Sequence, residues 1–162
     1  MKNFDELNNE FLLDDEMDKE DISPEAYDKY LTGVNEILEQ DNSNIDALKF
    51  KYFILFCQKK YEESIEICDL VLRKEPDNIE VLDFKAFNLF QLSRYKEVIE
   101  ICKRMLDIDP KNKEALEQWN SACLMSDDNT LPKPPESILK KILKAVITFG
   151  IFAGIIYFIL SL

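Results

Sequence analysis

The chain has 162 residues, of which 46% are apolar and 11% aromatic, enough for the core of one soluble domain of ordinary size. Its charge is uneven: residues 132–162 carry +3, and the rest of the chain carries −15. A domain this acidic repels phosphates, which excludes nucleic acid as a partner. Because the chain has no histidine, it lacks the commonest general base and a common metal ligand. We therefore expect no enzymatic activity, no bound metal and no cofactor.

Residues 1–22 form an acidic stretch with nine Asp and Glu residues, and they lack the basic start and apolar run of a secretory signal. Phe4, Leu7, Phe11 and Leu12 fall at helical spacing within it. Two interpretations are open. The stretch is either an acidic arm or imperfect first helix that caps the domain, or a regulatory arm that docks Phe4, Leu7 and Phe11 elsewhere on the same domain.

A helix is predicted to begin at Ser23-Pro24-Glu25, which combines a good N-cap, a proline suited to the first helical position and a favourable acidic residue. The apolar residues that follow recur 34 positions later as similar residues. This helix is therefore the second helix of an early, degenerate repeat.

Residues 43–76 and 77–110 are two copies of one unit. They align without a gap, and 16 of 34 positions are identical. A fixed period of this length predicts a solenoid of helix pairs that bury their apolar faces by stacking. The predicted helices span residues 45–57, 61–75, 79–91 and 95–108, and Pro76 and Pro110 end the two units. Residues 114–125 match only a first helix, and we expect them to cap the array.

Residues 24–125 resemble the tetratricopeptide repeat (TPR) family. Leu48 and Leu82 stand in its large first position, Leu55 and Leu89 in its later aromatic position, and Pro76 and Pro110 in its closing proline position. Departures occur where the family has small or aromatic residues, at Tyr52 and Ala86, Ser64 and Val98, and Cys68 and Cys102. The resemblance implies an all-α solenoid of about two and a half to three repeats plus a capping helix.

Four cysteines show no CxxC spacing, and Cys68 and Cys102 occupy equivalent positions on apolar helix faces. Such cysteines are typical of reduced core residues in a cytosolic compartment.

The C-terminal part is expected to be a membrane anchor. Residues 126–137 contain three prolines and read as a linker, and residues 138–144 are amphipathic and basic. The next 18 residues, Ala145–Leu162, contain no charge, which predicts a single transmembrane helix rather than a buried globular one. The layout resembles a tail-anchored protein with its repeat domain in the cytoplasm, because the lysines flank only the amino side of the apolar segment.

Two further expectations concern this segment. Lys140, Lys141 and Lys144 are placed to contact anionic lipid headgroups. Gly150 and Gly154 form a GxxxG step, which either supports a homodimer through the membrane helix or is a chance spacing.

The expected domains are 1–22 for the arm or first helix, 23–125 for the TPR domain, 126–137 for the linker, and 138–162 for the basic segment and membrane helix.

The candidate binding site lies on the first helix of each repeat. Leu48, Tyr52 and Leu55 define the face toward the paired helix, and three phenylalanines of each repeat lie on another arc. We expect Phe50 and Phe84 to pack between helix pairs. In the resembled family part of this arc lines a concave groove that binds peptides, and the alternative is that all these rings are core. The predicted groove residues are Lys49, Phe53, Phe56, Asp83, Phe87 and Phe90.

The resemblance also indicates what the groove does not bind. Chaperone-binding members of the family hold a terminal carboxylate with lysine, asparagine and arginine, and the matching positions here do not carry that set. We therefore expect an apolar, basic-flanked segment as the ligand. The predicted function is a membrane-anchored adaptor for a protein partner; the alternative is a permanent structural subunit of a membrane complex, and an enzyme is a distant third.

Overall fold

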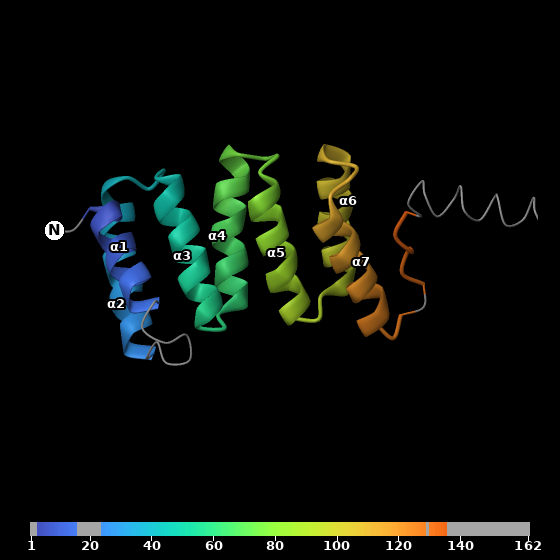
Figure 1. The fold of residues 1–162 in the computed structure, drawn as a ribbon, viewed down its shortest axis with the longest axis horizontal. Coiled ribbons are helices and arrows are strands. Elements are labelled where there is room, and N and C mark those ends of the chain that lie inside the picture. Colours follow the sequence, from blue (N-terminus) through green and yellow to red (C-terminus); the bar gives the residue numbers. More distant parts are fainter. Residues whose placement is uncertain (1–2, 16–23, 129, 136–162) are drawn as a thin grey trace, which may run out of the picture. The chain divides into compact units, whose positions relative to one another are not determined.

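The computed structural model describes residues 3–15, 24–128 and 130–135. Over these ranges the chain is all-α, and its helices lie side by side in chain order (Figure 1). Two compact units are distinguished, Met1–Leu131 and Pro132–Leu162, and every described helix belongs to the first. The seven helices are α1 (Phe4–Asp15), α2 (Pro24–Gln40), α3 (Ile45–Cys57), α4 (Tyr61–Lys74), α5 (Ile79–Gln91), α6 (Tyr95–Ile108) and α7 (Lys113–Met125).

The helices predicted from the repeat are confirmed, with ends that differ by at most one residue. Asn44, Asn78 and Asn112 are the N-caps of α3, α5 and α7. Each side-chain oxygen accepts a hydrogen bond from the backbone N–H three residues on, at 2.9, 3.1 and 2.7 Å respectively. Because the cap recurs every 34 residues, the three helices start at the same point of the repeat.

Each turn between paired helices contains one residue with a positive φ, and the residue types at these positions do not predict that conformation. Lys59, between α3 and α4, has φ 59°, and Ser93, between α5 and α6, has φ 57°. Their backbone N–H groups donate to the carbonyls of Phe56 and Phe90, at 2.8 and 2.9 Å. Neither residue is glycine or asparagine, which are the usual occupants of this left-handed region.

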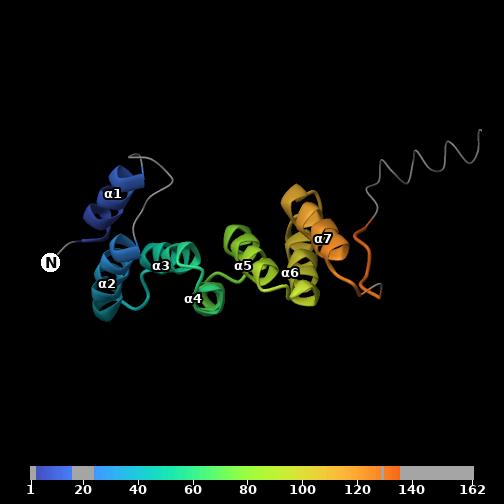
Figure 2. The ribbon, with the colours of Figure 1, turned by 90° about the horizontal axis from the view of Figure 1, so that it is seen from below.

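The helices form two layers. The odd-numbered helices contact one another, α1 with α3 and α5 with α7, and Figure 2 shows α1 and α5 on the opposite side from α2 and α4. The main core fills the space between the layers from α3 to α7, with Val71, Leu82, Cys102, Met105 and Trp119 among its buried residues. Stacking of successive pairs therefore buries a continuous core, as expected for a solenoid.

Helix α1 packs on α2 and α3 through a second core cluster. Leu7 and Phe11 are 2% and 5% exposed. The Phe11 ring lies edge-on to Tyr30 and to Phe50, with centroids 5.1 Å apart in both cases. The helix thus packs on α2 and α3 through Leu7 and Phe11, a contact that both the capping-helix and the docked-arm interpretations predict.

Cys68 and Cys102 are fully buried free thiols. Burial, and secondarily the nearby carboxylates of Asp69 and Asp83, raises the pKa of each thiol to about 12. Both are therefore protonated core residues at neutral pH.

Within the described ranges, no helix is long and apolar enough to cross a bilayer. The predicted membrane helix Ala145–Leu162, with Gly150 and Gly154, lies outside the described residues, as do Lys140, Lys141 and Lys144.

Candidate functional site

The odd-numbered layer exposes aromatic rings at equivalent positions of two repeats. Phe53 on α3 is 39% exposed and Phe87 on α5 is 43% exposed. Phe56 and Phe90, one helical turn further along, are partly buried. We call these four residues the aromatic face.

Ring contacts hold the aromatic face in place. Phe56 lies 5.5 Å from Phe87 between ring centroids, which links α3 to α5. Phe56 also contacts Tyr61, and Phe90 contacts Tyr95, at 5.6 and 5.4 Å. The two exposed rings are therefore presented on an ordered aromatic base, with little side-chain entropy left to lose on binding.

The two remaining phenylalanines of the arc pack between helix pairs, as expected. Phe50 is buried in the cluster with α1. Phe84 lies 4.5 Å from Tyr52 and 5.3 Å from Phe56 between ring centroids. The three rings of each repeat thus differ in exposure although they share one arc.

Lys49 lies on the same layer, but its charge is already compensated. Its Nζ is 3.0 Å from a carboxylate oxygen of Glu80, so the ion pair joins α3 to α5. The ion pair therefore lies at the junction between the two repeats, within the predicted groove. Lys49 is consequently not an unpaired cation for a ligand carboxylate.

Asp83 lies at the rim of a pocket between α5 and α7, which we call the α5–α7 pocket. Its volume is about 320 Å³, and its lining includes Asp83, Phe87, Phe90, Glu114, Glu117 and Gln118. The Gln118 Nε2 donates a hydrogen bond of 2.7 Å to Asp83 Oδ1. Burial raises the pKa of Asp83, and the charge of Glu114 adds to the rise.

The structure brings Asp83, Phe87 and Phe90 together in one pocket and adds α7 to the site. Phe56 lies against Phe87, whereas Phe53 is exposed on α3 outside this pocket. Glu114, Glu117 and Gln118 were not among the groove residues predicted from the sequence. Their position in the capping helix could have indicated them, because that helix aligns with the first helices that carry the aromatic face.

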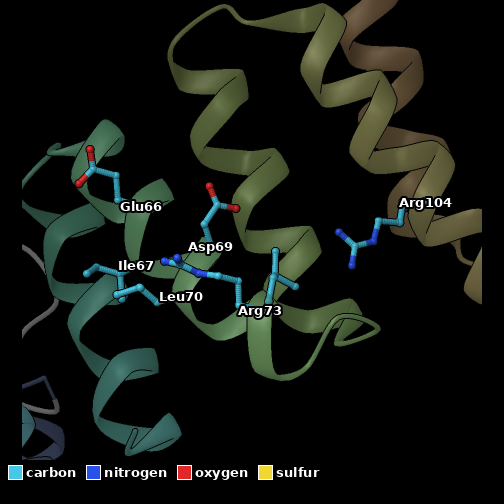
Figure 3. A pocket seen from close by; sticks show the side chains of 7 residues that line it. Glu66, Ile67, Asp69, Leu70, Arg73 and Arg104 are labelled. Carbon is cyan, nitrogen blue, oxygen red and sulfur yellow. The ribbon is translucent and has the colours of Figure 1, made fainter. Parts of the chain in front are cut away.

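A second pocket, of about 710 Å³, lies on the even-numbered helices α4 and α6. Figure 3 shows Arg73 extending along α4 toward Asp69 and Leu70, with Arg104 reaching in from α6. Asp69 pairs with Lys85 at 2.5 Å, and Arg104 donates to the carbonyl of Pro76. Leu70, an exposed apolar residue, also lines this pocket, which was not predicted from the sequence.

No protein-family model and no curated protein sequence matches the chain. Solved structures do. The first TPR domain of Spaghetti (RPAP3), bound to the HSP90 peptide SRMEEVD, superposes with a TM-score of 0.55 at 18% identity, over 60% of this chain and 78% of that one. MamA from Desulfovibrio magneticus RS-1 superposes with a TM-score of 0.57 at 17% identity, over 63% of this chain and 58% of that one.

The chain has a tetratricopeptide-repeat fold. The human RPAP3 domain in solution gives the same result, with a TM-score of 0.54 at 18% identity over 61% of this chain and 78% of that one. In the TPR frame, α1–α2, α3–α4 and α5–α6 are three helix pairs of the described residues, and α7 is the additional last helix. The chain spans little more than half of MamA, and identities this low establish the fold alone.

Among the described residues of the TPR unit, no three Cys, Asp or Glu side chains are placed to hold a metal ion.

Proposed function

We propose that this protein is a membrane-anchored protein-interaction scaffold that presents its aromatic face to a peptide or helical segment of a partner. The observation that carries the proposal is the exposure of Phe53 and Phe87, which stand at the same position of two successive TPR units. Large apolar rings repeated on one face of a soluble unit typically mark an interaction surface. Covering one such ring contributes roughly 1.5–3 kcal/mol.

The peptide-bound RPAP3 domain supports peptide binding by this chain, but the peptide that RPAP3 binds does not suit the surface found here. The RPAP3 domain holds SRMEEVD, a peptide rich in acidic residues. Here the corresponding layer carries Glu80, Asp83, Glu114 and Glu117, and its Lys49 is paired. An acidic peptide would be repelled by this surface. An apolar segment with basic neighbours fits it better.

Crosslinking from native membranes tests the aromatic face. Phe53→Ala/Phe87→Ala should lose one discrete crosslinked partner while its helicity stays unchanged by circular dichroism. Leu70→Ala/Ile108→Ala is the matched control, since both residues are exposed apolar side chains on the even-numbered helices. If both double variants recover the partner equally, the aromatic face is not the contact. A partner that stays bound in equal amounts through purification would favour a permanent subunit.

The membrane part of the proposal rests on the sequence of Ala145–Leu162. This segment is proposed to span the bilayer with the TPR unit on the cytoplasmic side, and Lys140, Lys141 and Lys144 to contact lipid headgroups. Resistance to alkaline extraction, together with protease access to the TPR unit from the cytoplasmic side, is the expected result. Release at alkaline pH would contradict the anchor.

A Gly150→Leu/Gly154→Leu variant tests the homodimer. The variant should give less crosslinked dimer than the wild-type chain.

A further inference from the structure

The α5–α7 pocket lies directly beside the exposed ring of Phe87 and has a one-sided charge. Asp83, Glu114 and Glu117 line it, and no Lys or Arg is among its lining residues. None of these three carboxylates belongs to an ion pair of the described residues. By contrast, the pocket between α4 and α6 contains Arg73 and Arg104 beside its carboxylates. Charge complementarity therefore indicates a cationic ligand for the α5–α7 pocket, whereas the pocket between α4 and α6 carries both charges and indicates none.

One polar atom of the Gln118 side chain is buried without a hydrogen-bond partner. Gln118 uses its Nε2 to donate to Asp83, and its Oε1 is a buried acceptor with no partner. A buried acceptor without a donor is uncommon in proteins and costs free energy until it is satisfied. The raised pKa of Asp83 has the same origin, because burial and Glu114 disfavour its charge and no nearby cation offsets them.

The group that complements the carboxylates of the pocket is an organic cation on a long side chain. Asp83, Glu114 and Glu117 are not grouped as a metal site among the described residues. A guanidinium carries five N–H donors and an ammonium three, and both bring a positive charge. The pocket of about 320 Å³ is open to solvent beside Phe87 and Phe90, which would cover the apolar stem of such a side chain.

We propose that the α5–α7 pocket receives an Arg or Lys side chain of the partner segment, whose neighbouring apolar residues pack on Phe87 and continue along the aromatic face toward Phe53. The inference rests on the proposed function and adds the chemistry of the partner: a basic, amphipathic segment. Asp83, Glu114 and Glu117 select the cation.

A displayed library of random peptides, selected on the full chain in detergent micelles, tests the proposal. The expected result is enrichment of Arg or Lys next to Leu, Ile or Phe. Glu114→Gln/Glu117→Gln should bind the selected peptides on the order of tenfold more weakly than the wild-type chain. Replacing Arg in a selected peptide by citrulline, which keeps the size and removes the charge, should cause a similar loss.

A matched variant separates this pocket from the general attraction of an acidic protein. Glu63→Gln/Glu100→Gln removes the same charge from exposed positions of α4 and α6 and should leave binding nearly unchanged. Equal losses in the two double variants would overturn the proposal. Apolar peptides without Arg or Lys that lose binding in Phe87→Ala would overturn it as well, and would leave the aromatic face intact as the binding surface.

The chain's own basic segment is the competing occupant. If Lys140→Gln/Lys141→Gln/Lys144→Gln increases peptide capture, the pocket is filled from within the chain and the assignment to a partner is wrong. Unchanged capture in this variant, together with the losses expected above, supports the partner.

Discussion

Asn88 and Ile54 occupy the same position of successive repeats, and both are fully buried. Asn88 Nδ2 donates to the carbonyl of Phe84 at 2.8 Å, whereas its Oδ1 has no partner. We expect Asn88→Ile to raise the free energy of unfolding by about 1 kcal/mol, because it removes an unsatisfied acceptor. The reverse change, Ile54→Asn, should lower it by roughly 2–4 kcal/mol. Thermal unfolding followed by circular dichroism measures both, and a loss of stability in Asn88→Ile would contradict the argument.

The raised pKa of Asp83 predicts a pH-dependent effect on stability. A carboxyl group whose pKa is higher in the folded than in the unfolded state destabilises the fold when it is ionised. This unfavourable contribution is complete above the folded pKa and disappears below the unfolded pKa. Asp83→Asn should therefore raise the melting temperature at neutral pH, and the gain should shrink as the pH falls through the raised pKa of Asp83 and vanish below the ordinary pKa of Asp. A gain that grows toward acidic pH would show the opposite sign of the shift.

At the scale of the elements, the turns within the helix pairs are candidates for stabilisation. Lys59 and Ser93 adopt the left-handed backbone conformation, which costs a residue with a Cβ about 1 kcal/mol relative to glycine. Lys59→Gly and Ser93→Gly should each raise the free energy of unfolding by about this amount. Lys60→Gly is the matched control, because Lys60 has φ −85° and gains nothing from glycine. Chemical denaturation curves would decide, and equal effects at residues 59 and 60 would refute the explanation.

Helix α1 is expected to be a structural part of the TPR unit. Phe11 is buried and contacts Tyr30, Phe50 and Phe53. Phe11→Ala should therefore lower the free energy of unfolding by about 3–5 kcal/mol. The neighbouring Leu12→Ala should change it by less than about 0.5 kcal/mol, since Leu12 is half exposed. A regulatory arm would give a different result: Phe11→Ala would raise partner affinity and leave the unfolding curve unchanged.

At the scale of the whole molecule, the division into two units predicts where the chain can be shortened. Leu131 packs against the main core, and Asp128 pairs with Lys96 at 3.1 Å. A chain that ends at residue 135 should keep the melting temperature of the full chain, because it retains both contacts. A chain that ends at residue 125 should melt at a lower temperature, because it loses both. Identical melting curves for the two would show that residues 126–131 do not stabilise the repeats.

The sequence by itself determined the helices and their stacking order. Caps such as Asn44 and Asn78, the apolar period and the closing prolines act over a few residues, and the repeat of 34 residues carries each local signal into the next unit. Among the described helices, the sequence left α1 ambiguous, because a shift of 34 residues back from α3 falls on residues 11–23, out of register with α1.

The tertiary structure decided which side chains of the candidate site are free. The sequence predicted both Lys49 and Phe53 as groove residues. In the stacked repeats Lys49 pairs with Glu80, 31 residues away, whereas Phe53 is exposed. Gln118 reaches Asp83 across 35 residues, and its own Oε1 is buried without a partner. Periodicity places a residue on a face of its own helix, but partners, burial and pockets depend on how neighbouring helices approach. That approach is set by the packing of whole helix pairs, and no local pattern specifies it.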